Sequence, residues 1–105
     1  VVSHGALLRI FSKNPLLADQ VAINYRRADI TPRQLAMLDF ATLIATDSHL
    51  ATEADFDELR THGFTDDDIW DIGAITALFA LSNRMANLTA MRPNDEFYSM
   101  ARQPR

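Results

Sequence analysis

The chain has 105 residues, of which 48% are hydrophobic and 23% charged, and its formal net charge is −4. This composition is typical of a small globular domain and excludes an intrinsically disordered segment. Positive side chains are scattered apart from the pair Arg26–Arg27, which excludes the basic surface that nucleic-acid binding requires. Because the sequence has no cysteine, it offers no disulfide framework, no thiolate metal site and no thiol nucleophile.

The sequence also lacks the patterns of membrane insertion and export. Its longest nearly apolar stretch, IGAITALFALS, is far shorter than the roughly 20 residues that span a bilayer. The opening residues VVSHGALLRIFSKN contain neither a positively charged leader segment nor a small-residue cleavage site. We therefore expect a cytoplasmic protein that binds neither membrane nor nucleic acid.

Helix start signals recur in the first half of the chain. Asn14 precedes Pro15 in the order expected of an N-cap and a first helical residue. Thr31 and Pro32 repeat this order, and Gln34 stands where a capping box needs its second member. These signals predict helices that begin at residues 15 and 32.

The second half of the chain contains two more start signals and one clear stop. Thr52 is followed three residues later by Asp55, which favours a helix from residue 53. Gly63 is typical of the left-handed residue that ends a helix. Thr65 then precedes three aspartates, which are favourable beside the positive end of a helix dipole.

These boundaries predict five helices, followed by an extended, proline-punctuated tail over residues 91–105. The helices are expected over residues 2–13, 15–26, 32–47, 53–62 and 66–90. The sequence shows no strand pattern and no internal repeat. We therefore expect a single all-α domain over residues 1–105, a helical bundle with the helix of residues 66–90 at its centre.

Two of the predicted helices are apolar on more than one face. Only Asp39 and Thr42 interrupt the stretch LAMLDFATLIA, and the last helix has apolar side chains on opposite sides. A helix that is apolar all round has to be buried on all sides, and a chain of this length has difficulty surrounding two. We therefore expect part of this surface to contact another subunit in a homo-oligomer, a dimer or larger.

The three histidines are the first candidates for chemistry. His62 falls in the last turn of a predicted helix, where a structural role explains it. His49 falls in a predicted loop and is explained as a solvated residue. His4 lies one turn from Leu7 and Leu8, which places it on a helix face that packs, and a packed core histidine is the simplest explanation.

The other polar candidates also have structural explanations. Asp39 lies in an apolar run, where burial can adapt a carboxyl group to proton transfer, although the wet edge of a helix is the more usual place. Asn83 and Asn87 share one helix face and suit hydrogen bonds between helices. The consecutive aspartates 66–68 point in different directions on a helix, so we expect no metal site, and we expect no cofactor.

Several segments, taken in order, resemble one protein family. These segments are VVSHGALLR, LADQVAINYRRADITPRQLAMLDFATLIA, FDELRTHGFTDDDIWDIGAITALFALSNRMAN and RPNDEFYSM. Together they resemble the alkylhydroperoxidase D-like, peroxidase-related proteins of the carboxymuconolactone decarboxylase superfamily. The resemblance covers essentially the whole chain, but only the C-terminal half to two-thirds of a family member. It implies an all-α bundle of the alkylhydroperoxidase D type and an assembly of several copies.

The resemblance also assigns a role to His4. In that family a Cys-x-x-Cys pair is followed, after three spacer residues, by a histidine. Here VVS fills the spacer and His4 matches the histidine, so the second cysteine would fall immediately before Val1. The implied activity is reduction of a small hydroperoxide by the thiol pair, which an external dithiol then resets, with His4 as catalytic base or relay. The glutamate of the family's proton relay has no matching position in this chain.

Two other functions remain open from the sequence. The same packing surfaces suit a non-enzymatic helical oligomerisation module. A decarboxylase-like lyase of the same superfamily would act on a small cyclic acid and use bases in a pocket instead of cysteines. The intact mass of the protein would separate the peroxidase from the oligomerisation module. A Cys-x-x-Cys pair ending directly before Val1 would favour thiol chemistry over the lyase.

Overall fold

The structure is a computed structural model that describes residues 2–102, and these residues form helices and turns without a strand. The α-helices are α1 (Val2–Ser12), α2 (Leu17–Asn24), α3 (Pro32–Asp47), α4 (Glu53–Thr61), α5 (Asp66–Leu88) and α6 (Glu96–Ser99). Two short 3-10 turns, η1 (Tyr25–Arg27) and η2 (Ser48–Leu50), follow α2 and α3. The all-α prediction is confirmed, while α6 is a short helix within the tail that was predicted to be extended.

The chain divides into two compact units. One unit combines Val1–Asp29 with Met91–Arg105, and the other is Ile30–Ala90. The expectation of one domain over residues 1–105 stays a prediction, and the two units are described separately.

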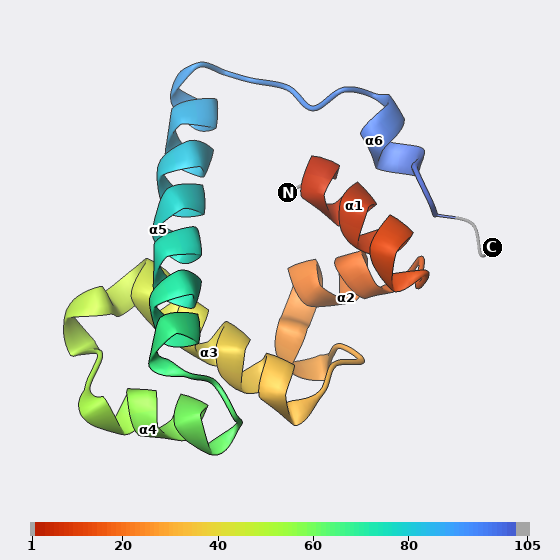
Figure 1. Cartoon of the computed structure of the whole chain (residues 1–105). Coiled ribbons are helices and arrows are strands. Elements are labelled where there is room, and N and C mark those ends of the chain that lie inside the picture. The colour runs from red at the N-terminus through yellow and green to blue at the C-terminus, as the bar shows by residue number, and fades with distance from the viewer. Residues whose placement is uncertain (1, 103–105) are drawn as a thin grey trace. The chain divides into compact units, whose positions relative to one another are not determined.

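In the first unit, α1 packs against α2 and α6 (Figure 1). Ala6 is fully buried, Ala18 is 8% exposed, and a Cβ built on Gly5 would lie 3.6 Å from the Ala18 Cβ. Because these residues are small, the backbones of α1 and α2 can approach each other closely. A buried arginine, Arg9, makes the contact between α1 and the segment around α6.

In the second unit, α3, α4 and α5 surround a small aromatic and aliphatic core. Phe40, Leu59 and Phe64 are buried, and Leu59 is only 1% exposed. The rings of Phe40 and Phe56 meet edge to face with their centroids 5.9 Å apart, a favourable geometry for an aromatic pair. This cluster fixes α4 between the ends of the other two helices.

The turn after α4 closes this core. The Gly63 N–H donates to the Arg60 carbonyl and the Phe64 N–H donates to the Leu59 carbonyl, which together form a Schellman motif. Gly63 has φ +86°, a left-handed conformation, and Phe64 returns to pack beside Leu59. The left-handed conformation of Gly63 was predicted from the sequence. Arg33 of α3 lies 3.9 Å from the centre of the Phe64 ring and holds the same turn.

The helix start signals are confirmed in α3, α4 and α5. The Gln34 N–H donates to the Thr31 hydroxyl at 3.1 Å, which completes the predicted capping box of α3. The Thr52 N–H donates to the Asp55 carboxylate at 2.8 Å at the start of α4. In both cases a side chain satisfies a backbone group that the helix itself leaves without a partner.

The predicted start of the second helix at Pro15 is wrong. The Asn14 side chain accepts from the Leu16 N–H at 3.0 Å, and the Leu17 N–H donates to the Asn14 carbonyl. Asn14 therefore forms a turn with the residues that follow it instead of capping a helix, and α2 begins only at Leu17.

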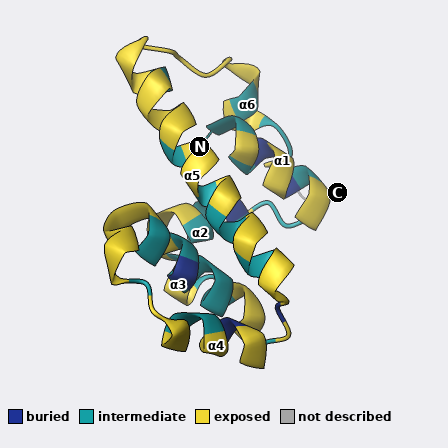
Figure 2. Ribbon diagram, turned by 60° about the vertical axis from the view of Figure 1, so that its left-hand side comes forward, coloured by how far each residue is buried: buried dark blue, intermediate teal, exposed yellow. Residues whose placement is uncertain are grey.

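The described residues do not bury α5 at the centre of a bundle, and its apolar surface stays largely uncovered, as expected for a chain of this length. No residue of α5 is buried, and exposed residues predominate along its length (Figure 2). Its side chains that contact the core are Ile69 and Ile72, whereas Trp70 is 77% exposed. Within residues 2–102, no helix is long and apolar enough to cross a membrane.

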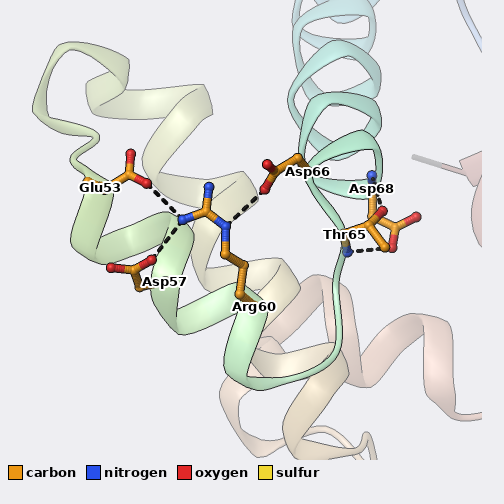
Figure 3. A network of polar contacts seen from close by, with 6 residues as sticks. All are labelled: Glu53, Asp57, Arg60, Thr65, Asp66 and Asp68. Atoms are coloured by element: carbon orange, nitrogen blue, oxygen red, sulfur yellow. Dashed lines mark hydrogen bonds and ion pairs between the residues drawn. The ribbon is translucent and has the colours of Figure 1, made fainter.

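The ends of α4 and α5 are also joined by charged side chains (Figure 3). Arg60 of α4 donates to Glu53 at 2.8 Å and Asp57 at 2.7 Å on its own helix, and to Asp66 of α5 at 2.9 Å. These hydrogen bonds, that of Glu53 first, raise the pKa of Arg60 above its ordinary value. One guanidinium thus connects α4 to the first turn of α5.

Beside this network, Asp68 and Thr65 form a reciprocal cap (Figure 3). The Thr65 N–H donates to the Asp68 carboxylate at 2.9 Å, and the Asp68 N–H donates to the Thr65 hydroxyl at 3.1 Å. The hydrogen bonds from Thr65 lower the pKa of Asp68 below its ordinary value of 3.8. The ionised carboxylate therefore stabilises the start of α5.

We expect Gly63→Val to lower the free energy of unfolding by more than about 1 kcal/mol, because a β-branched residue is strained at positive φ. Gly63→Asn should cost less, since Asn tolerates this conformation. Gly73→Ala is the matched control: this glycine lies inside α5, a Cβ there meets no atom within 4 Å, and the change should stabilise by about 0.5–1 kcal/mol. Denaturant unfolding measures all three, and a neutral Gly63→Val would contradict the strained turn.

We expect Asp68→Asn to reduce the loss of stability that the protein shows in acid. A carboxylate whose pKa is lowered by folding stabilises the protein above its ordinary pKa, and this contribution disappears as the pH falls below about 4. Asn keeps an oxygen acceptor but cannot ionise, so this part of the pH dependence should vanish. Asp67→Asn removes the same charge at a neighbouring position, and this variant should retain the pH dependence that Asp68 contributes. If the unfolding free energy of the two variants depends on pH in the same way, the ionised Asp68 carboxylate does not stabilise the start of α5 as proposed.

Candidate active site

His4 lies in the first turns of α1 and is exposed. The expectation that it belongs to a packed face is therefore wrong for the described chain, because the buried residues of α1 are Ala6 and Arg9 on another side of the helix. A side chain that reaches solvent at the start of a helix can meet a small molecule, whereas a core histidine cannot. The position of His4 is thus compatible with a catalytic role.

The face of α1 that carries His4 is apolar. Leu7, Leu8 and Phe11 follow His4 at helical spacing, and all three are exposed, Phe11 by 79%. An imidazole at one end of an apolar helix face combines a proton-transferring group with a surface suited to a carbon chain. We refer to these four residues as the α1 face.

Arg9 holds the other side of α1 in place. It is only 4% exposed, its Nε donates to the Met100 carbonyl at 2.8 Å, and its Nη2 donates to the Phe97 carbonyl at 2.9 Å. A buried guanidinium is costly unless its N–H groups are bonded, so removal of these acceptors would be destabilising. By fixing the buried side of α1 to the segment around α6, Arg9 determines which side faces solvent.

Arg9 was not among the functional candidates that the sequence indicated. The available signal was a lone arginine inside the apolar run ALLRIF, three residues after a buried alanine and therefore on the same side of the helix. Its acceptors, however, lie about ninety residues further along the chain, in the tail. No local pattern shows that contact.

The structure places two of the other candidates, Asp39 and His62, around a groove between α3 and α4. This groove has a volume of about 480 Å³, and Asp39, Asp55, Glu58 and His62 line it together with apolar side chains. His62 is the C-cap of α4, and its Nε2 lies 3.2 Å from Glu58 Oε1. The His62 carbonyl also accepts from Arg33 Nε at 3.0 Å. These contacts support a structural role for His62 over a catalytic one.

The remaining candidates do not converge on a site. His49 lies in η2 and is exposed, as its interpretation as a solvated residue requires. Asn83 and Asn87 are exposed on α5, and neither makes a side-chain hydrogen bond to another helix within residues 2–102. Of the aspartates 66–68, the first binds Arg60 and the last caps α5. The described part of the chain contains no group of three or more His, Cys, Asp or Glu side chains that could hold a metal ion.

The solved structures that are similar to this chain include two peroxidase-related proteins with the same fold. One is the alkylhydroperoxidase AhpD core, an uncharacterized peroxidase-related protein from Ralstonia eutropha JMP134, with 65% sequence identity and a TM-score of 0.96. The other is an uncharacterized peroxidase-related protein from Silicibacter sp. TM1040, with 46% identity and a TM-score of 0.93.

The alignments cover nearly all of this chain but only part of each relative. They include 99% and 96% of this chain, and 55% and 53% of the Ralstonia and Silicibacter proteins, so the chain spans about half the length of either. No family model matches the sequence, and no curated protein matches it. The shared sequence and the shared fold make this chain an alkylhydroperoxidase D-like, peroxidase-related protein.

Proposed function

We propose that the protein to which this chain belongs reduces small hydroperoxides by thiol chemistry, with His4 as the group that moves protons. The observation that carries this proposal is the exposure of His4 at the start of α1, on a chain similar to peroxidase-related proteins. The chain itself has no cysteine, so the thiols have to come from residues outside it.

The reaction requires two thiols and one proton-transferring group. A thiolate attacks the outer oxygen of the hydroperoxide, the O–O bond breaks, and the sulfur becomes a sulfenic acid. The leaving alkoxide takes a proton and departs as an alcohol. The second thiol then condenses with the sulfenic acid to give a disulfide and water, and an external dithiol reduces the disulfide.

His4 is suited to two parts of this reaction. If a cysteine lies immediately before Val1 and the helix continues through it, its sulfur and the imidazole are four residues apart and share one helix face. A nearby imidazole stabilises the thiolate, which is the reactive form of the sulfur. The same group can deliver the proton that the leaving alkoxide requires. The apolar remainder of the α1 face offers contacts to the organic part of a small hydroperoxide.

We expect His4→Ala in the full-length protein to slow hydroperoxide consumption by roughly 10²-fold, because general acid–base catalysis contributes about this much. The thiol pKa should also rise, which thiol alkylation measured against pH reports. Helical content should stay the same, since His4 is exposed. His49→Ala is the matched control: it removes another exposed histidine, in η2, and should leave both measurements unchanged.

Two results would contradict the proposed role of His4. The first is unchanged turnover and unchanged alkylation in His4→Ala. The second is an equal loss in His4→Ala and His49→Ala, which would indicate a general effect of removing a histidine. A full-length protein without any hydroperoxide turnover would instead favour the non-enzymatic helical module.

We also propose that the protein forms a homo-oligomer, a dimer or larger, through surface on α3 and α5. The proposal is supported by the apolar side chains that α5 leaves exposed, among them Trp70, Leu78 and Leu88. Large exposed apolar patches are uncommon on monomeric proteins and mark contact surfaces.

We expect Leu78→Asp to dissociate this oligomer. Leu78 is 59% exposed, so a carboxylate is tolerated in the separate subunit but not at an apolar interface. Ala54→Asp, at an exposed position on α4, is the control and should leave assembly unchanged. Sedimentation at micromolar concentration measures both variants, and a monomeric wild-type protein would contradict the proposal.

A further inference from the structure

A second groove lies in the unit of residues 30–90, between α3 and α5. It has a volume of about 430 Å³, which falls within the range of roughly 300–1,000 Å³ that small-molecule sites occupy. We refer to it as the α3–α5 groove. Its lining includes Ile44 and Ala45 of α3, Ala77, Ala80 and Leu81 of α5, and the polar residues Ser48 and Arg84.

The side chains of α5 give this groove its shape. Ala77 and Ala80 are too small to fill the space beside α3, and they leave an apolar trough between the two helices. The α5 wall runs from Thr76 to Arg84, about 12 Å at the rise of an α-helix. A trough of this length and polarity suits an aliphatic chain better than a compact polar molecule.

Arg84 gives one end of the groove a positive charge. It is the single charged residue of the lining and stands at the C-terminal end of the α5 wall. Within residues 2–102, no side chain or carbonyl is hydrogen-bonded to or paired with its guanidinium. Arg60 and Arg9 differ from it, since the first binds three carboxylates and the second two backbone carbonyls. An arginine without a partner beside an apolar trough can accept a carboxylate from a ligand.

We propose that the α3–α5 groove binds an amphipathic monocarboxylate of medium chain length. The aliphatic chain lies along Ala77, Ala80 and Leu81, and the carboxylate accepts hydrogen bonds from the guanidinium of Arg84. The Ser48 hydroxyl is a further donor in the lining. The positive charge excludes an alkylammonium ion and disfavours an uncharged alcohol. This site involves no residue of the α1 face, so it does not depend on the proposed peroxidase chemistry.

Calorimetric titration of the full-length protein with octanoate, octanol and octylamine tests the proposal. Octanoate should bind saturably and at least about tenfold more tightly than octanol, because a hydrogen bond to a charged group is worth about that factor. Octylamine should show no binding. Methyl resonances of the lining residues Ile44, Ala77, Ala80 and Leu81 should shift on addition of octanoate to the wild-type protein, which locates the site without any substitution.

Variants of the lining residues distinguish the contribution of the charge to ligand binding from the contribution of the groove's shape. Arg84→Gln should weaken octanoate binding by about tenfold and leave octanol binding unchanged. Arg84→Lys should restore part of the affinity. Arg27→Gln removes the same charge from a residue that does not line the groove, and it should change nothing. Ala80→Phe fills the trough and should abolish binding of both ligands.

Three outcomes would overturn the proposal. They are the absence of saturable octanoate binding, equal octanoate affinity in Arg84→Gln and the wild type, and methyl shifts confined to residues outside the groove. If Ala80→Phe dissociates an oligomer while octanoate still binds, the groove is an interface between copies of the chain and not a carboxylate site.

Discussion

The cluster of Phe40, Leu59 and Phe64 holds three helices together with few buried side chains, and this shortage of buried apolar surface shapes the rest of the structure. Because the cluster lies near one end of α5, that helix contacts the core through residues such as Ile69 and Ile72. Apolar side chains further along α5 stay exposed. The hydrophobic effect contributes about 25 cal/mol for each Å² removed from water, so such a surface favours any partner that covers it.

Three predictions that depend on neighbouring residues agree with the structure. Thr31 with Gln34, Thr65 with Asp68, and the turn at Gly63 involve contacts over a few residues, so the order of residue types is enough to predict them. Asn14 shows the limit of this approach, because the same residue type can cap a helix or form a turn. The sequence could not decide between the two.

The predictions that depend on distant contacts were less successful. Spacing placed His4 on one face of a helix but could not show whether that face is covered, and the structure leaves it exposed. Arg9 determines the orientation of α1 through carbonyls in the tail, which no local pattern reveals. The α3–α5 groove likewise arises from two helices about thirty residues apart, and alanines such as Ala80 carry no signal of a cavity in the sequence.

The proposed reaction needs groups that this chain does not supply. The structure contributes an exposed imidazole, an apolar helix face and a fold shared with peroxidase-related proteins. The 105 residues of the sequence contain no cysteine, so the proposed reaction depends on thiols that this chain does not contain. Thiol chemistry therefore explains the position of His4 only if two cysteines precede it at the right spacing.

Mass mapping of the reduced full-length protein, before and after one equivalent of a hydroperoxide, tests this account most directly. We predict a peptide with a Cys-x-x-Cys pair whose second cysteine lies immediately before Val1. Peroxide should remove two hydrogen atoms from this peptide, as formation of one disulfide requires, and a dithiol should restore them. The absence of such a pair, or a pair that stays reduced in the presence of peroxide, would contradict the account.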